Sequence, residues 1–191
     1  MIYNSSYLQV FGLMLALTLS GCASHPSHVI VAPDMTITSA FYHNNKQAQL
    51  DVIDMRTANH IIQILREGDA ATLLSAQERL EDTIKHSLNQ HWQKQGLDIQ
   101  PNGKNTISVA IEKSLISVTQ ETFKYQAQTE IVLKVTVNNG KKTLTSTFKN
   151  SGASNGPLKA DIAVLERNFN QRLTSVLQQI LANEEISSFL K

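Results

Sequence analysis

Apolar and polar positions alternate through the middle of the chain, a period-two pattern that predicts β-strands with one buried face. A first run covers residues 107–111, and a longer run keeps one parity from Phe123 to Val137. Asn139-Gly140 follows the longer run, and both residues tolerate the positive φ angles of a type I′ turn. We therefore predict a long antiparallel hairpin that returns over residues 143–148, with Phe123 and Tyr125 in the core beside the aliphatic residues.

Two other segments repeat apolar residues every three or four positions, which predicts amphipathic helices that face a core. In the first, Ser75 and Glu78 have capping-box spacing, so the helix is expected to begin there and to end at Gly96. In the second, Pro157 stands in the first turn and Asn183 can end the helix. The two stripes are Ala76, Leu80, Ile84, Leu88 and Trp92, and then Leu158, Ile162, Leu165, Phe169, Leu173, Val176, Leu177, Ile180 and Leu181; Ile186, Phe189 and Leu190 are expected to pack back.

Short apolar runs ahead of the first helix predict further strands. They cover residues 49–55, 61–65 and 71–74, and Glu67-Gly68-Asp69 supplies a turn between the last two. Strands combined with one-faced helices predict an α+β fold with two layers. We expect a mainly antiparallel sheet with the two amphipathic helices packed on one face.

The first 21 residues contain no Asp, Glu, Lys or Arg and include an apolar run over residues 10–19. That run is too short to span a bilayer, which needs about 20 residues, but it fits the h-region of a signal peptide. Leu19-Ser20-Gly21-Cys22 resembles the lipobox of bacterial lipoproteins. We therefore predict a removed signal peptide (residues 1–21), a lipidated tether (22–47) that includes a possible short strand at Val29–Val31, and a single α+β domain (48–191).

The lipobox resemblance implies that acyl chains on Cys22 anchor the chain in a membrane, so that the domain faces the periplasm. Ala23 follows the cysteine where an Asp commonly signals retention in the inner membrane. The resemblance therefore implies the outer membrane.

Composition excludes several classes of protein. With 17 Lys and Arg against 16 Asp and Glu, the net charge is +1, and no basic stripe of the kind that binds nucleic acid is visible. The single cysteine cannot form an intrachain disulfide or a cysteine-rich zinc site. We expect no cofactor, no metal and no nucleic-acid partner.

Motifs that would indicate catalysis are weak. Gly152-Ala-Ser154-Asn-Gly156 spells the G-x-S-x-G of a hydrolase nucleophile elbow, but no histidine follows His91, as the order of the triad would require. We interpret it as a loop that leads into the last helix. His86 and His91 lie five residues apart on a helix and do not converge on a metal, so we expect solvated histidines. We predict that the protein is not an enzyme.

Charged residues gather in the sequence around the first strands: Asp51, Asp54, Arg56 and Glu67. Asp54, Arg56 and Thr57 form a weak candidate interaction site, and a structural ion pair between Asp54 and Arg56 at a strand end is the favoured alternative.

The chain as a whole resembles the YajG family of bacterial lipoproteins. The resemblance rests on the lipobox, Val29-Ile-Val-Ala-Pro33, Asp54-Met-Arg56-Thr57, Gly96-Leu with Pro101-Asn-Gly103, the hairpin, and Ile186-Ser-Ser-Phe189-Leu-Lys191 at the end. It implies no agreed activity, and Cys22 is the one functional position that it transfers.

Two functions remain open. The first is an accessory module that binds an envelope protein through the sheet face opposite the helices or through an edge strand. The second is a carrier or sensor of a small envelope ligand, such as a lipid or glycan fragment, which would need an apolar pocket between sheet and helices.

Overall fold

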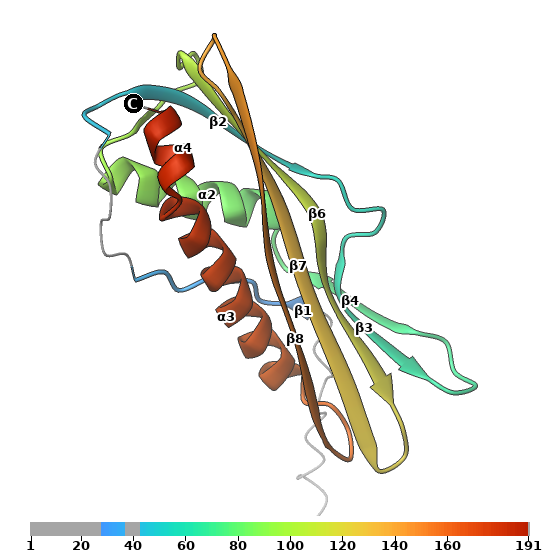
Figure 1. Ribbon diagram of the computed structural model, residues 1–191. Coiled ribbons are helices and arrows are strands. Elements are labelled where there is room, and N and C mark those ends of the chain that lie inside the picture. The colour runs from blue at the N-terminus through green and yellow to red at the C-terminus, as the bar shows by residue number, and fades with distance from the viewer. Residues whose placement is uncertain (1–27, 37–42, 191) are drawn as a thin grey trace, which may run out of the picture.

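The computed structural model describes residues 28–36 and 43–190, which form one curled sheet with helices on one of its faces (Figure 1). The described strands are β1 (His28–Val29), β2 (Gln47–Asp54), β3 (His60–Arg66), β4 (Thr72–Ala76), β5 (Asp98–Ile99), β6 (Asn105–Gln120), β7 (Lys124–Asn138) and β8 (Thr143–Pro157). The described helices are α2 (Leu80–Lys94), α3 (Ile162–Leu181) and α4 (Glu184–Phe189).

The predicted hairpin is present, with β7 inside the sheet and β8 at one of its edges. β6, β7 and β8 are consecutive antiparallel strands, and Asn138 pairs with Thr143 across the turn that contains Gly140, whose φ is 81°. A β-bulge interrupts β6 between Ile111 and Lys113. Because the bulge adds one residue, the buried positions change from odd numbers before it to even numbers after it.

β2 and β3 lie one after the other along the same edge of β6, and both are parallel to it. β2 pairs with residues 105–111 and β3 with residues 116–120. β1 and β5 extend the sheet through parallel pairs with β4 and β2. The α+β class is therefore confirmed, but the sheet is mixed and curled, so the two-layer, mainly antiparallel description is not confirmed. A parallel β2 and β3 cannot be inferred from alternation, which is the same for both strand directions.

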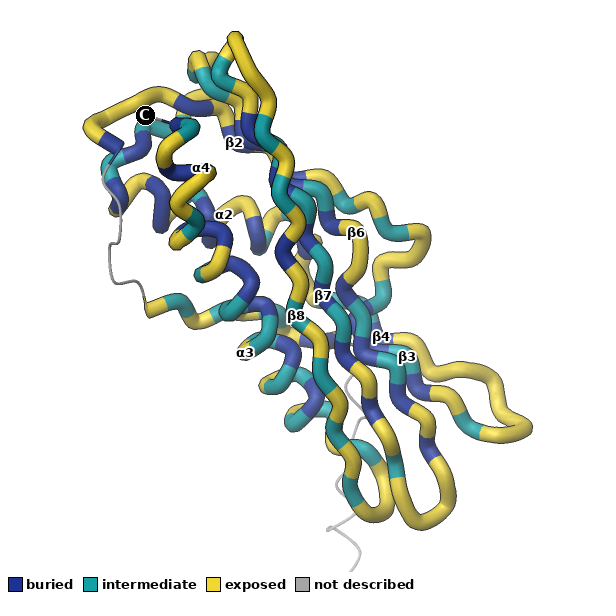
Figure 2. The backbone as a smooth tube through the Cα atoms, viewed as in Figure 1, coloured by how far each residue is buried: buried dark blue, intermediate teal, exposed yellow. Residues whose placement is uncertain are grey.

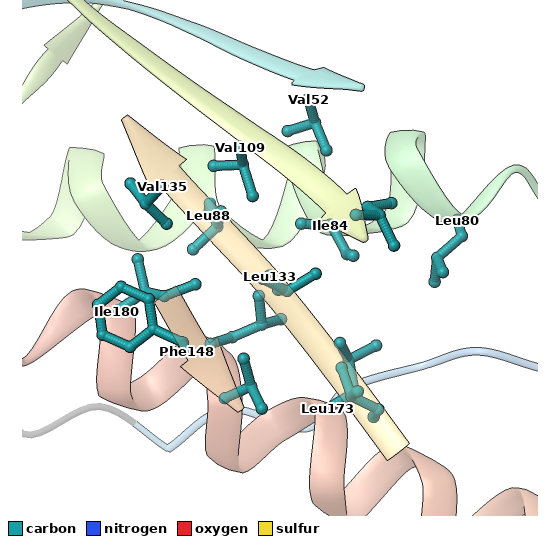
Figure 3. Close-up of a cluster of buried hydrophobic side chains, with 14 of the residues drawn as sticks. Val52, Leu80, Ile84, Leu88, Val109, Leu133, Val135, Phe148, Leu173 and Ile180 are labelled. Carbon is teal, nitrogen blue, oxygen red and sulfur yellow. The ribbon is translucent and has the colours of Figure 1, made fainter. Parts of the chain in front are cut away.

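The core lies between the sheet and the helices (Figures 2 and 3). Leu133 of β7, Ile84 of α2 and Leu173 of α3 are fully buried in this core. Ile186 and Leu190 pack back as predicted, but through the third described helix, α4, which Asn183 caps by accepting a hydrogen bond from the Ile186 amide at 2.9 Å. Alternation and helical periodicity thus identified the core faces.

Both predicted helix starts were wrong. Ser75 and Ala76 belong to β4, where pairing with β3 and β1 keeps them extended, and α2 begins after Arg79. β8 likewise continues to Pro157, which pairs with Lys124. α3 therefore begins later, with Asp161 as its N-cap accepting from the Ala163 amide at 2.8 Å.

Phe123 and Leu158 were predicted in apolar stripes but are exposed by 78% and 63%. Phe123 lies in the β6–β7 turn and Leu158 in the β8–α3 connection, both beyond the helices that cover the sheet. Tyr125 is partly buried against the core, as predicted.

The described part of the predicted tether, residues 28–36, contacts the domain. Val29 is fully buried in β1, which forms within the predicted apolar run. The backbone of Ile30 exchanges hydrogen bonds with α3, donating to Glu166 at 2.8 Å and accepting from Asn170 at 3.0 Å. This stretch is therefore held along α3.

Candidate functional site

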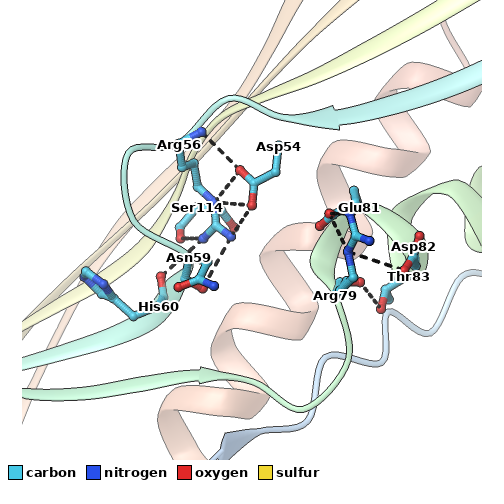
Figure 4. Close-up of polar contacts among 9 residues, drawn as sticks. All are labelled: Asp54, Arg56, Asn59, His60, Arg79, Glu81, Asp82, Thr83 and Ser114. Atoms are coloured by element: carbon cyan, nitrogen blue, oxygen red, sulfur yellow. Dashed lines mark hydrogen bonds and ion pairs between the residues drawn. The ribbon is translucent and has the colours of Figure 1, made fainter.

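Asp54 and Arg56 form an ion pair at the end of β2 (Figure 4). The Arg56 guanidinium donates to both carboxylate oxygens of Asp54, through Nε at 2.9 Å and through Nη2 at 2.7 Å. The Arg56 side chain is 7% exposed and that of Asp54 is 17% exposed. Bidentate geometry with low exposure makes this the most tightly bound charged pair that we describe.

The same guanidinium fills the break between β2 and β3 along β6. Residues 112–115 of β6 face neither strand, since β2 pairs only as far as Ile111 and β3 begins pairing at Ile116. Arg56 donates through Nη1 to the carbonyl oxygen of Ser114 at 2.9 Å and to that of His60 at 3.2 Å. A side chain thus satisfies backbone acceptors that a continuous strand would have satisfied.

The Asp54 carboxyl remains ionised at this site. Burial acts most strongly and favours the neutral acid, but the hydrogen bonds from the side chain and backbone of Arg56, together with its charge, outweigh burial and lower the pKa of Asp54. The ionised carboxylate of Asp54 thus holds the Arg56 guanidinium in place, which is a structural role.

A hollow of about 340 Å³ borders this pair and the start of α2. Arg79 and Glu81 line its other side and pair with each other, as Figure 4 shows. Of the three predicted interaction residues, Asp54 and Arg56 are brought together, whereas Thr57 is exposed. Of the other charged residues near the first strands, Asp51 pairs with Lys85 at 3.5 Å, and Glu67 lines another hollow.

The outer edge of β8 is a second candidate site, and the sequence did not reveal it. β8 spans 15 residues, and within the described chain its single strand partner is β7. Hollows of about 540 and 320 Å³ lie between β8 and the α3–α4 side. Arg172 of α3 donates to the carbonyl oxygen of Ser151 at 3.1 Å and to Asn150 Oδ1 at 3.0 Å. Apolar alternation stops at Phe148, so the predicted strand was too short.

The G-x-S-x-G segment lies within β8. The prediction that it forms a loop was therefore wrong. Gly152 pairs with Thr129 and Gly156 with Tyr125. A Cβ on Gly152 would overlap the Arg172 guanidinium, and a Cβ on Gly156 would lie 2.7 Å from the Tyr125 ring. Both glycines therefore leave room for a large neighbouring side chain, which explains the motif without catalysis.

The histidines do not converge on a metal site in the described chain. His91 is buried, with Nδ1 2.7 Å from the Ser87 carbonyl oxygen, and His43 is buried too, so the expectation of solvated histidines was wrong for both. The described residues include no group of three His, Cys, Asp or Glu side chains placed to hold a metal ion. None of the described helices combines the length and apolar character that crossing a membrane requires.

Comparison with known proteins identifies the class as an envelope lipoprotein. The family described as "Uncharacterized lipoprotein" matches residues 33–191. The chain is 22% identical over 185 residues to "Uncharacterized lipoprotein YajG" of Escherichia coli K12, with 95% of each chain covered. The chain therefore belongs to the YajG family of lipoproteins, whose description assigns no enzymatic activity.

One of two similar solved structures supports the fold. Protein XCC0632 from Xanthomonas campestris is 12% identical and has a TM-score of 0.61, over 85% of this chain and 97% of the other. The rare lipoprotein B from Shewanella oneidensis is 8% identical with a TM-score of 0.40, over 73% and 98%. The first of these likenesses shows the fold alone.

Proposed function

We propose that this chain is a lipid-anchored, non-catalytic module of the outer membrane, facing the periplasm, that binds an envelope protein through the edge of β8. The single observation that carries the proposal is a 15-residue edge strand whose outer side has no strand partner in the described chain. Such an edge presents backbone donors and acceptors to which an extended segment of another protein adds.

The geometry of the edge fixes which backbone groups are offered. The Ser151 carbonyl accepts from Arg172, so it points away from β7. Because backbone direction alternates along a strand, the groups of Thr147, Lys149 and Ala153 point outward as well. α3 lies beside this edge, and a partner strand would occupy the hollows between helix and strand.

The interior supports the module over the carrier. The space between the sheet and the helices is filled by large buried side chains, among them Trp92, Phe169 and Leu133. A carrier would need an apolar cavity there. The hollows that we describe lie at the surface, and polar side chains make up most of their linings.

The anchor in this proposal is Cys22, exposed as the new N-terminus after removal of residues 1–21. Residues 22–27 would then link the lipid to β1, and the domain would extend from there to Lys191. We expect Cys22→Ser to abolish labelling with radioactive palmitate and to release the protein from membranes. Labelling that persists in Cys22→Ser would refute the anchor.

Edge pairing is tested by two substitutions at Thr147, which is exposed on β8. Thr147→Pro removes the outward N–H, whereas Thr147→Val keeps it and retains a β-branched side chain. With a photoreactive residue at position 145, we expect one stoichiometric crosslinked protein from native membranes that Thr147→Pro removes and Thr147→Val preserves. Equal crosslinking in both variants would exclude the β8 edge, and saturable thermal protection by envelope lipids without any protein would favour the carrier.

We propose a structural role for Asp54 and Arg56, because their polar atoms are engaged within the protein. Of the three residues, Thr57 is the one whose side chain is exposed to solvent and available for contact with a partner.

A further inference from the structure

Two large apolar side chains protrude from one end of the sheet. We call this end the tip and define it by the β6–β7 turn (residues 121–123) and the β8–α3 connection (residues 158–160). Phe123 and Leu158 are 78% and 63% exposed. The Leu158 amide donates to the Phe123 carbonyl oxygen at 2.8 Å, so the two residues are neighbours. Adjacent exposed apolar residues of this size mark a contact surface more often than a single one does.

The tip is held rigidly in a conformation that costs free energy. Leu158 has a φ of 59°, a left-handed conformation that bulky residues rarely adopt. The buried side chain of Gln120 donates to the Leu158 carbonyl oxygen at 2.8 Å and accepts from the Ala160 amide at 3.0 Å. The buried Gln120 amide thus holds Leu158 in a strained conformation with most of its side chain exposed to solvent.

The tip lies at the end of the sheet toward which the N-terminal end of β1 points (Figure 1). β1 pairs in parallel with β4, His28 opposite Ser75, and β4 follows the β3–β4 turn. That turn and the tip line the same hollow, of about 1020 Å³. His28 is therefore at the tip-facing end of β1, and the six residues back to Cys22 reach at most about 20 Å.

Charges around the hollow favour insertion of apolar groups over attraction to anionic lipid. Basic and acidic side chains are equal in number there: Arg66, Lys124 and Lys159 against Glu67, Asp69 and Glu121. A balanced surface gains little from a net field. Lys159, exposed next to Leu158, can still extend its ammonium toward lipid phosphates while its methylenes stay at the apolar boundary.

We propose that Phe123 and Leu158 insert into the headgroup region of the phospholipid bilayer that holds Cys22. The inference rests on the lipid anchor of the proposed function and is independent of pairing at β8. Insertion would orient the sheet with the tip at the membrane and the β7–β8 turn away from it. β7 runs from Lys124 to Asn138, so the two ends are separated by about 45 Å.

The test uses the full lipidated chain in vesicles of phosphatidylethanolamine and phosphatidylglycerol. Acylated Cys22 does not react with thiol probes, so Thr122→Cys places one fluorophore in the tip. Lys141→Cys, in the β7–β8 turn at the opposite end (Figure 1), is the matched control. We expect brominated lipids to quench the tip probe and leave the control probe unchanged, and raising the salt concentration to preserve this difference.

The apolar side chains are tested by Phe123→Ser combined with Leu158→Gly in the Thr122→Cys background. Glycine adopts the positive φ of Leu158 without strain, so the connection is expected to keep its conformation. We expect loss of quenching in this variant. Unchanged quenching in this variant, or equal quenching of the tip and control probes, would overturn the inference. Crosslinking at β8 tests the proposed function separately, and the mass of Cys22 tests the anchor common to both.

Discussion

Among the residues that the structure describes, two arginine side chains donate to the carbonyl groups of strands, and they do so at different kinds of edge. Arg56 donates to Ser114 from a nearly buried position and is paired with the Asp54 carboxylate. Arg172 donates to Ser151 from a partly exposed position and has the neutral Asn150 side chain as its second partner. Arg56 closes a break between two strands of the same sheet, whereas Arg172 covers an edge that has no strand beyond it in the described chain. Because Arg56 is buried and paired with a charged group, we expect its contacts to persist in the folded protein. Because Arg172 is partly exposed and contacts neutral groups, we expect a binding partner to be able to displace it.

The largest expected effect comes from removing the buried arginine. Arg56→Ala removes the guanidinium that donates to the Asp54 carboxylate and to the carbonyl groups of Ser114 and His60, and we expect a loss of about 3 kcal/mol in the free energy of unfolding. Urea denaturation of the purified domain measures it. The control combines Arg56→Met with Asp54→Asn, which removes both charges and should recover part of the loss. Equal stability of Arg56→Ala and the wild type would contradict the role assigned to Arg56.

The glycines of β8 sharpen the same comparison, because they differ in what they face. Gly156→Ala places a methyl group against the Tyr125 ring, which is fixed on β7, and we expect a loss of about 2 kcal/mol in the free energy of unfolding. Gly152→Ala meets the end of the flexible Arg172 side chain, which can move at the expense of its hydrogen bonds, so the loss should be about 1 kcal/mol. Ser154→Ala is the control within the motif. Thermal unfolding compares the three, and the reverse order would be inconsistent with this geometry.

These glycines also show where sequence reasoning reached its limit. Alternation correctly identified the buried positions of β7 from Ala127 to Val137, because the helices cover that strand. β8 has the same length, but Phe148 is its single buried hydrophobic residue, and the small polar residues that follow resemble a loop. β8 extends to Pro157 because its backbone pairs with β7. Backbone pairing of this kind leaves no pattern of apolar residues in the sequence.

The candidate site was predictable to a similar extent. Asp54 and Arg56 lie two residues apart at a strand end, so their pairing could be anticipated from the sequence. The break that Arg56 spans could not be anticipated, since it depends on β2 and β3 sharing one edge of β6. The exposure of Phe123 and Leu158 likewise depends on where the helices stop covering the sheet.

Removing the exposed arginine should affect binding more than folding. Arg172→Ala removes two hydrogen bonds to neutral acceptors, and we expect a loss of about 1 kcal/mol in the free energy of unfolding. The uncovered Ser151 carbonyl should then increase the yield of the β8 crosslink. Arg172→Lys, which keeps a donor without the planar fork, is the matched control. A decrease in crosslinking would mean that Arg172 itself contacts the partner.

The smallest expected effect is the dependence of stability on pH, and it distinguishes the two arginine sites by charge. The pKa of Asp54 is lowered in the folded state, so its stabilising contribution is complete above the unfolded value of about 3.9 and disappears as the pH falls through the folded value. Glu130, on the sheet face opposite the helices, also has a lowered pKa because of hydrogen bonds from Lys113 and Lys149. Its contribution changes with pH in the same direction, in the acid range below its own unfolded value of about 4.3.

Added salt distinguishes the contributions of Asp54 and Glu130 to stability. Lys113 and Lys149 are about half exposed, so added salt should screen the contribution of Glu130, whereas the buried Arg56 contact should be screened much less. We therefore expect that, at high salt, Asp54→Asn flattens the loss of stability between pH 5 and pH 3 more than Glu130→Gln does. Arg172→Ala should leave this slope unchanged, because Arg172 hydrogen-bonds to neutral acceptors. Urea denaturation across this pH range measures the stability of all three variants. If Arg172→Ala changed the dependence of stability on pH, an ionised group would contribute at the edge of β8.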